Sequence, residues 1–193
     1  MNLALDLDGV LFDFNQAFVQ LARKVHPELE CPNVGDHWPR AWDYLDEYLG
    51  KPEVSKLWRM VTRSTDFWRD IPSYWWAADL LEAAYGRADN IYFITSRSGN
   101  HVQRQTWMAL MDITQDVSHN GAVIPVPNPE AKIPLLRDLN IHYFVDDKKE
   151  TVVRALVECP KTQTAVWDQP WNRDFVFPVR LTSVEDFTMW VGR

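Results

Sequence analysis

The sequence predicts an α/β fold built on a central parallel sheet, and two features of the chain carry this prediction. Short apolar runs of strand length recur along it, and segments with the apolar spacing of a helix stand between most of them. Strands that alternate with helices are typical of a parallel sheet covered by helices. Ligands of such sheets bind beyond the carboxyl ends of the strands, so we expect a functional site there.

The expected elements follow from these patterns. Strands are predicted at 3–7, 91–95, 122–126, 142–145 and 164–167, and helices between the later strands at 102–111, 132–139 and 149–157. The gap between the first two strands is far longer than an ordinary crossover. It contains helical patterns at 15–25, 41–48, 54–63 and 77–85. We therefore expect a mostly helical insert at 15–88 over the edge of a core made of 1–14 and 89–193.

Composition limits the class of protein. The chain has 193 residues, 46% of them hydrophobic, which suits one domain with an inserted subdomain. A net charge of −7 without a Lys/Arg cluster argues against a partner that is duplex nucleic acid. Cys31 and Cys159 form no CxxC motif and are expected to be free thiols in a reducing compartment. Asp6 and Asp8 interrupt any leader, and no apolar stretch approaches the ~20 residues of a membrane helix, so a cytoplasmic protein that does not engage a membrane is expected.

Polar side chains gather at the carboxyl ends of three of the predicted strands, in their last residues or directly after them. In chain order they are Asp6 and Asp8, then Thr95, Ser96 and Arg97, and finally Asp146 and Asp147. Four carboxylates brought together repel, so either a pKa rises or a cation enters. Oxygen ligands suit Mg²⁺, which in proteins commonly binds one or two carboxylates together with phosphate oxygens. With these hydroxyls and Lys132, which opens the helix before the fourth strand, the set indicates phosphoryl chemistry.

Each motif taken alone has a plainer reading. Thr95 and Ser96 could cap the next helix, and Lys132 could be an ordinary surface lysine. The run DDKKE at 146–150 could be a helix start whose acids favour the helix dipole. Asp13 has no expected role beyond capping or a local pair.

The order of the motifs favours a functional site over these plainer interpretations, because the order resembles that of the haloacid dehalogenase (HAD) superfamily. The resemblance spans residues 2–147 and consists of DLDGV at the first strand, ITS at the second, Lys132, and a strand-terminal DD. It implies a Rossmann-like fold of three layers with a central parallel sheet and a helical cap inserted after the first strand. Caps of this kind close over a site, exclude water and favour small substrates.

The resemblance also implies roles for the acids. Asp6 would attack phosphorus and form an aspartyl-phosphate. Asp8 would protonate the leaving oxygen and then deprotonate the attacking water, which favours a phosphatase over a dehalogenase. Mg²⁺ would bind Asp6, the backbone carbonyl of Asp8 and one of the last two acids. The family alignment favours Asp147 as that ligand and Asp146 as a supporting acid, and the choice is left open.

The remaining core residues would bind the phosphoryl group. Thr95, helped by the amide of Ser96, would donate hydrogen bonds to it, and Lys132 would neutralise charge on Asp6 and the phosphate. The resemblance thus implies a phosphoric monoester hydrolase with Mg²⁺ as its cofactor. It leaves a homodimer open.

Within the superfamily, the insert most resembles the 5′(3′)-deoxyribonucleotidases of mammals, phages and bacteria. The run DLDGVLFDF puts Phe14 where that family has a base-facing phenylalanine, and GDHWP puts His37 and Trp38 in its Gly-Phe-Trp stretch. Trp58 matches a further cap tryptophan, and DFWRDIP and VWDQPWNR resemble later segments. A flat nucleobase stacks on such rings, although packing inside the cap is the alternative for them. This resemblance implies a deoxynucleoside monophosphate as substrate.

Three departures leave the substrate open. His37 replaces a phenylalanine, and NPEA precedes Lys132 where the mammalian enzymes have a substrate-contacting arginine. Arg97 replaces a proline and could hold a sugar, hold a second phosphate, or pair with a cap acid. The alternatives are another small phosphate ester such as a sugar phosphate, a non-catalytic nucleotide-binding module, and a phosphatase for nucleic-acid ends.

Overall fold

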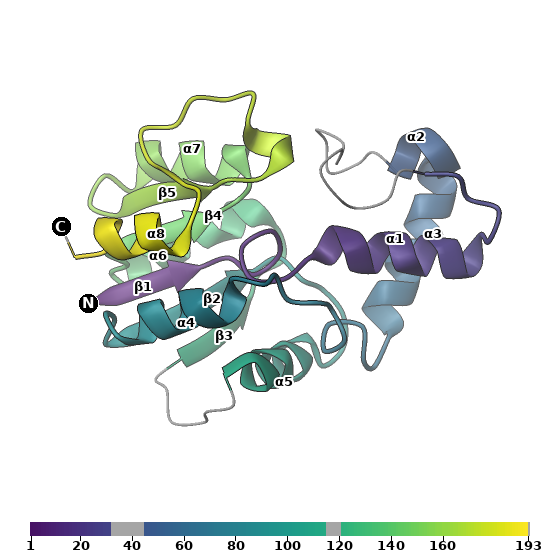
Figure 1. The fold of residues 1–193 in the computed structure, drawn as a ribbon, viewed down its shortest axis with the longest axis horizontal. Helices are drawn as coiled ribbons and strands as arrows, with labels where there is room; N and C mark the ends of the chain where they lie inside the picture. The colour runs from purple at the N-terminus through teal and green to yellow at the C-terminus, as the bar shows by residue number, and fades with distance from the viewer. Residues whose placement is uncertain (32–44, 115–120, 193) are drawn as a thin grey trace.

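The computed structural model describes residues 1–31, 45–114 and 121–192. Its centre is a six-stranded parallel sheet in the order β3-β2-β1-β4-β5-β6, which confirms the predicted fold class (Figure 1). The strands are β1 (Asn2–Leu5), β2 (Asn90–Thr95), β3 (Gly121–Pro125), β4 (Tyr143–Asp146), β5 (Gln163–Trp167) and β6 (Arg180–Leu181). The first strand of the chain therefore lies between β2 and β4, in the middle of the sheet.

Both faces of the sheet are buried, which explains why its strands are continuous apolar runs. On β1, Leu3 and Leu5 belong to the apolar cluster on one face, and Ala4 belongs to the cluster on the other. All three side chains have no exposed surface. Alternate residues of a strand point to opposite faces, so a strand covered on both sides needs apolar residues at every position.

Helices cover the two faces and make the fold three-layered. Over one face lie α4 (Ala77–Tyr85), α5 (Val102–Thr114) and α8 (Val184–Trp190), and over the other lie α6 (Lys132–Asp138) and α7 (Lys149–Glu158). The 3₁₀ turns η1 (Pro129–Ala131) and η2 (Pro170–Asn172) lead into α6 and out of β5. The helix α4 packs against α5 and α8, although its sequence falls within the range expected for the insert.

The remaining helices form a separate group beyond the carboxyl end of β1 (Figure 1). They are α1 (Phe14–Val25), α2 (Leu45–Leu49) and α3 (Lys51–Arg63). The helix α3 contacts both α1 and α2. Asp13 caps α1, because its Oδ1 accepts a hydrogen bond from the backbone N–H of Gln16 at 2.9 Å.

Two connecting segments join this group to the sheet, and they run side by side. The N–H of Asp13 donates to the carbonyl of Pro72 at 2.8 Å, and the N–H of Tyr74 donates to the carbonyl of Leu11 at 2.9 Å. Phe12 and Ser73 form an isolated antiparallel bridge between them. The chain therefore leaves the core and returns to it at nearly the same place.

The predicted boundaries differ from the structure where local geometry intervenes. The first strand was expected to reach residue 7, but β1 ends at Leu5 because the chain turns sharply. Three successive amides, from Val10 to Phe12, donate to the carbonyl of Leu7. Gly9 occupies this turn at φ +83°, and a Cβ there would lie 2.3 Å from Oδ2 of Asp147, so no larger residue fits.

Two elements were not predicted at all. The strand β6 has two residues, too few for a periodic signal, and α8 has seven. Ser183 caps α8 by accepting a hydrogen bond from the N–H of Asp186. The expected helix at 41–48 corresponds to α2, and its residues 41–44 lie outside the described part of the chain.

Candidate active site

Three of the predicted strand-end acids meet at the centre of the sheet edge. Carboxylate oxygens of Asp6, Asp146 and Asp147 all lie within 4.8 Å of one another, and the three residues are buried. They meet because β1 and β4 are paired neighbours, and the N–H of Asp6 extends that pairing to the carbonyl of Val145 at 2.9 Å. An all-oxygen group of this size fits a hard divalent cation such as Mg²⁺.

Lys132 is the cation among these acids. Its side chain is only 2% exposed, and its Nζ lies 2.8 Å from Oδ1 of Asp6 and 2.8 Å from Oδ2 of Asp146. Burial lowers the pKa of Lys132, but Asp146 and Asp6 outweigh burial and raise this pKa above its usual value. The lysine therefore stays charged, and it is not the surface lysine that its sequence alone would suggest.

One lysine does not balance the acids around it. Burial raises the pKa of Asp6 to about 7, helped by Asp146 and Asp8 and opposed by Lys132. Burial, Asp146 and Asp6 also raise the pKa of Asp147 well above its usual value. The acids, when ionised, therefore carry more negative charge than Lys132 balances. This is the condition under which a buried group of carboxylates takes up a metal ion.

The two adjacent acids differ in their partners. Asp146 accepts hydrogen bonds on both oxygens, from Lys132 on Oδ2 and from the backbone N–H of Lys148 on Oδ1 at 2.8 Å. Asp147 accepts one on Oδ2 from Nε1 of Trp171 at 2.7 Å. In the described structure, Asp146 therefore accepts hydrogen bonds on both of its oxygens, and Asp147 accepts the one from Trp171 on Oδ2.

Thr95 is the last residue of β2, the neighbour of β1 on its other side, and Ser96 and Arg97 follow it. Thr95 is buried, and its Oγ1 accepts a hydrogen bond from the N–H of Arg97 at 3.2 Å. Ser96 is exposed and lines the pocket described below. The helix α5 begins only at Val102, so this pair does not cap it.

Arg97 makes an ion pair with Asp8. Its Nη2 donates to Oδ1 of Asp8 at 2.7 Å, and its Nε donates to Oδ2 at 3.0 Å. Asp8 therefore lies beside the acid cluster with its side chain turned to Arg97. The acid that Arg97 pairs with in the described structure thus belongs to the core and not to the cap, a partner that the sequence analysis did not consider.

A pocket of about 460 Å³ opens at these residues. Asp6, Lys132 and Asp147 lie at its polar end. The opposite end is apolar and is lined by side chains from α1, α3 and the segment after α3: Phe14, Phe18, Val54, Trp58 and Trp68. The pocket thus joins a charged end to an aromatic one.

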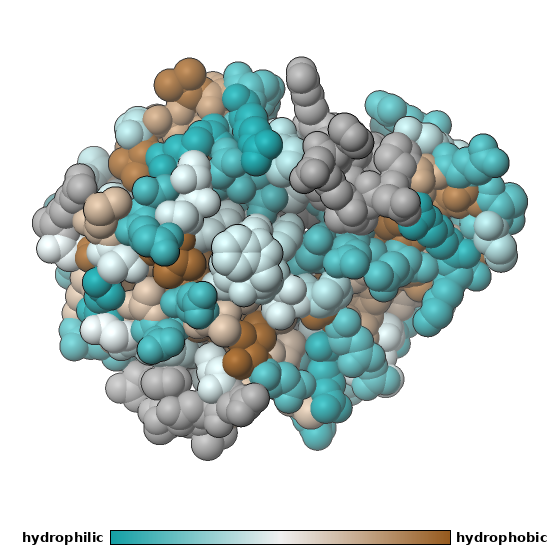
Figure 2. Space-filling model, viewed as in Figure 1, coloured by the Kyte–Doolittle hydropathy of each residue, from teal (hydrophilic) through white to brown (hydrophobic). Residues whose placement is uncertain are grey.

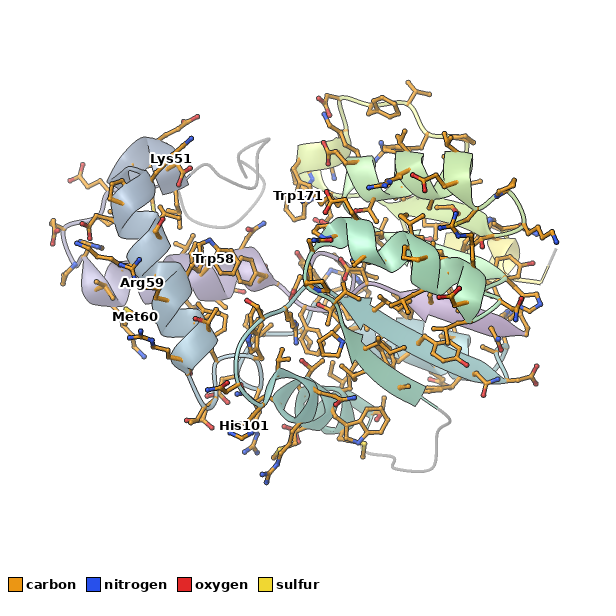
Figure 3. The ribbon with its side chains drawn as sticks, turned by 180° about the vertical axis from the view of Figure 1, so that it is seen from behind. Lys51, Trp58, Arg59, Met60, His101 and Trp171 are labelled. Carbon is orange, nitrogen blue, oxygen red and sulfur yellow. The ribbon has the colours of Figure 1, made fainter. Side chains whose placement is uncertain are left out.

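The aromatic end is built from stacked rings. The Phe14 ring stacks on Trp58 with centroids 5.2 Å apart and on Phe18 at the same distance. Trp58 is 40% exposed and extends from the side of α3 that faces the sheet (Figure 3). Phe14 and Trp58 therefore both pack in the α1–α3 group and line the pocket, whereas His37 and Trp38 lie outside the described residues.

The segment 167–172 supports the acids in a way that sequence reasoning missed. Nδ2 of Asn172 donates to the carbonyl of Asp147 at 2.7 Å, and Nε2 of Gln169 donates to the carbonyl of Gly9 at 2.7 Å. Together with Trp171, which lies at the edge of the core nearest the α1–α3 group (Figure 3), these residues hold both acid-bearing turns. The run VWDQPWNR was recognisable as a motif, but it does not reveal which backbone atoms its amides reach.

Replacing Lys132 by Met is expected to abolish activity and to lower stability, because it leaves Asp6 and Asp146 buried without their cation. Loss of one partner of a buried ion pair costs about 3–5 kcal/mol. Thermal melting and urea unfolding measure this loss. Lys149→Met is the control, since Lys149 is partly exposed and pairs with Asp174 at 3.6 Å on the surface, where a pair is worth roughly 0–1 kcal/mol. Equal losses in the two variants would contradict the buried ion pair.

Seen as a whole, the face of the molecule in Figure 2 is mostly hydrophilic, with apolar residues scattered over it. In the described part of the chain, no helix combines the length and the apolar character needed to cross a bilayer.

Comparison with known proteins identifies the fold. No protein-family model matches the chain. A haloacid dehalogenase-like hydrolase of Streptococcus pneumoniae superposes with a TM-score of 0.65 at 13% identity, covering 98% of this chain and 97% of that one. A HAD family hydrolase of Deinococcus radiodurans, solved with bound phosphate and sodium, gives 0.58 at 16% identity, covering 96% and 92%. A Bacillus subtilis protein described as a "putative HAD-hydrolase" bound to magnesium gives 0.58 at 14% identity, covering 100% and 98%.

One curated protein is similar in sequence. It is named "Putative 5'(3')-deoxyribonucleotidase", comes from Bordetella bronchiseptica, and is 35% identical over 72 residues. The match covers 37% of this chain and 37% of that protein, so it spans little more than a third of the relative's length.

Proposed function

We propose that this chain, which has the fold of the HAD-superfamily hydrolases as its motifs predicted, is a Mg²⁺-dependent phosphatase for small phosphate esters. The observation that carries the proposal is the position of Asp6. Its carboxylate is buried at the polar end of a pocket, touches Lys132, and lies within reach of two further acids. A carboxylate held in this way can act as a nucleophile toward phosphorus.

The reaction would proceed in two displacements. An oxygen of Asp6 forms a bond to phosphorus while the ester P–O bond breaks. Asp8 must enter this step protonated, on an oxygen lone pair that Arg97 does not occupy, and it gives that proton to the leaving oxygen. Water then attacks the aspartyl-phosphate and passes a proton to Asp8, and the bond between Asp6 and phosphorus breaks to release phosphate. Lys132 stabilises the charge that develops on the phosphoryl oxygens, and Thr95 and Ser96 bind the same group.

Asp6, Asp147 and the backbone carbonyl of Asp8 would hold Mg²⁺, with Asp146 in support. When bound, the ion supplies positive charge to the phosphoryl oxygens. Two features support this assignment. Three acids share one lysine, and both oxygens of Asp146 already accept hydrogen bonds from Lys132 and Lys148.

The helices α1–α3 would form the cap and select the substrate. We include residues from about 14 to 72 in the cap, and we leave α4 with the core because it packs on α5 and α8. The stacked rings of Phe14 and Trp58 offer a flat apolar surface opposite the acids. Together with the partial similarity to the Bordetella protein, this surface favours a deoxynucleoside monophosphate as substrate.

A panel of phosphate esters tests the substrate. We expect dUMP, dTMP or dGMP to be hydrolysed with kcat/KM at least tenfold above that for glucose 6-phosphate. Trp58→Ala should raise KM for the nucleotide by about tenfold with little change in kcat, because base stacking is worth roughly 1–3 kcal/mol. Trp75→Ala is the matched control, since Trp75 is 85% exposed and does not line this pocket.

Other outcomes would select the alternatives. Feeble turnover of nucleotides beside efficient turnover of sugar phosphates would reject the nucleotide and keep the phosphatase. Tight nucleotide binding with no phosphate release from any ester would identify a binding module instead.

A further inference from the structure

Arg97 lies beside the acid that the proposed mechanism uses for proton transfer. We propose that Arg97 is a positioning residue, which fixes the carboxylate of Asp8 for proton transfer and is itself fixed by Trp68. The inference rests on the proposed function, because Asp8 matters only if an ester bond is broken. What it adds is how the side chain of Asp8 is held in position.

The contacts of Arg97 fix both oxygens of Asp8. Nη2 donates to Oδ1 at 2.7 Å, and Nε donates to Oδ2 at 3.0 Å and approaches Oδ1 at 3.2 Å. A planar guanidinium bound to both oxygens defines the rotation of a carboxylate as well as its place. Proton transfer to a leaving oxygen depends on such placement, since an error of about 1 Å can cost about 100-fold in rate.

Arg97 is in turn held on several sides. Its side chain has no exposed surface, and Nη1 donates to Oγ1 of Thr106 at 3.1 Å. The centre of the guanidinium lies 4.7 Å from the Phe12 ring and 5.0 Å from the Trp68 ring. Arg97 belongs to the lining of the pocket, but all three nitrogens of its guanidinium already donate hydrogen bonds to Asp8 or Thr106, so we infer that its effect on the reaction passes through Asp8.

Trp68 connects this arrangement to the aromatic end of the pocket. Its indole Nε1 donates a hydrogen bond to the carbonyl of Ser98 at 3.0 Å, and its backbone N–H donates one to Oε1 of Gln105 at 3.1 Å. The same ring stacks on Phe14 with centroids 5.9 Å apart. One side chain therefore contacts both the surface offered to the leaving group and the arginine that orients Asp8.

The first test compares two esters in Arg97→Met. With a deoxynucleotide, whose leaving alkoxide needs a proton, we expect kcat to fall about 100-fold, within the range of general acid catalysis. With p-nitrophenyl phosphate, whose phenolate leaves without a proton, the first turnover should be within about threefold of wild type and appear as a burst. Steady turnover should then be slow, because water attack still needs Asp8. Arg104→Met, an exposed arginine on α5, is the matched control and should leave both reactions unchanged.

The second test is a double-mutant cycle with Asp8→Asn. If Arg97 acts through Asp8, adding Arg97→Met to Asp8→Asn should lower kcat by less than about threefold. Two losses that multiply would overturn the inference, and so would an equal loss of the burst and of nucleotide turnover in Arg97→Met. If Arg97→Met does not fold, Arg97→Lys gives the same comparison. It keeps the charge but not the two-point contact, and should lower nucleotide turnover by about tenfold while the p-nitrophenol burst keeps its wild-type rate.

These results separate the inference from the proposed function. A wild-type protein that releases phosphate from neither ester rejects the phosphatase itself. An active wild type in which the Arg97 variants slow the p-nitrophenol burst as much as they slow nucleotide turnover rejects only the role of Arg97.

Discussion

Asp6→Asn is expected to abolish phosphate release from every ester, with a loss of turnover on the order of 10⁴ or more, because it removes the proposed covalent nucleophile. The amide keeps the shape of the side chain but cannot attack phosphorus. Phosphate release under saturating Mg²⁺ measures the effect, and thermal melting checks that the variant folds.

Asp13→Asn is the matched control for this variant. It makes the same chemical change seven residues along the chain, and asparagine serves as well as aspartate at the helix cap where Asp13 binds the N–H of Gln16. It should keep activity within about twofold. If Asp6→Asn retained the wild-type rate, the covalent mechanism would be wrong.

Mg²⁺ should stabilise the protein strongly at pH 7.5 and weakly at pH 5.5. Burial raises the pKa of Asp6 to about 7 and that of Asp147 well above its usual value. The unfolded chain has carboxyl pKa values near 4. Between about pH 4 and pH 7, the folded protein therefore keeps protons on these two carboxyl groups that the unfolded chain has already released. Without metal, the stability from these groups is present below about pH 4 and is lost as the pH rises through about 7.

A divalent cation reverses this loss, because it binds the ionised carboxylates and competes with protons. At a Mg²⁺ concentration about 100-fold above Kd, binding adds about 2.7 kcal/mol, or roughly 5–10 °C in melting temperature for a chain of this size. Differential scanning fluorimetry at the two pH values measures it. EDTA should abolish turnover in parallel.

Two acids provide the comparison for this experiment. Asp147→Asn should remove the stabilisation by Mg²⁺. Asp174→Asn should keep it, because Asp174 pairs with Lys149 on the surface. A melting temperature that rises equally in both variants, or equally at the two pH values, would contradict the assigned metal site.

The acids of the candidate site could be predicted because backbone topology alone brings them together. Asp6 directly follows β1 and Asp146 ends β4, and these strands pair side by side, so the meeting of the two acids requires only that the strands be recognised. Lys132 needed the family resemblance, since nothing in its neighbours distinguishes it from a surface lysine. Its burial depends on where α6 begins relative to β4, which a local pattern does not contain.

The side-chain contacts could not be predicted in the same way. The pairing of Arg97 with Asp8 depends on rings from two distant segments, Phe12 and Trp68, that close around the guanidinium. The helix α4 has the pattern of any amphipathic helix, and the sequence does not say whether its apolar face packs on the sheet or in the insert. Its contacts with α5 and α8 place α4 in the core, and the sequence analysis had not predicted α8.

The paired connections between core and helical group have an evolutionary consequence. The two connecting segments are joined by a hydrogen bond of 2.8 Å from the N–H of Asp13 to the carbonyl of Pro72. The part of the chain between these two residues is therefore an insertion whose two ends lie next to each other. Lengthening, shortening or exchanging such an insertion leaves the ends of the strands in place. If the helices α1–α3 select the substrate as proposed, selection can therefore change the residues at the aromatic end of the pocket without disturbing Asp6 and Lys132, and new substrate ranges become accessible by exchange of one segment.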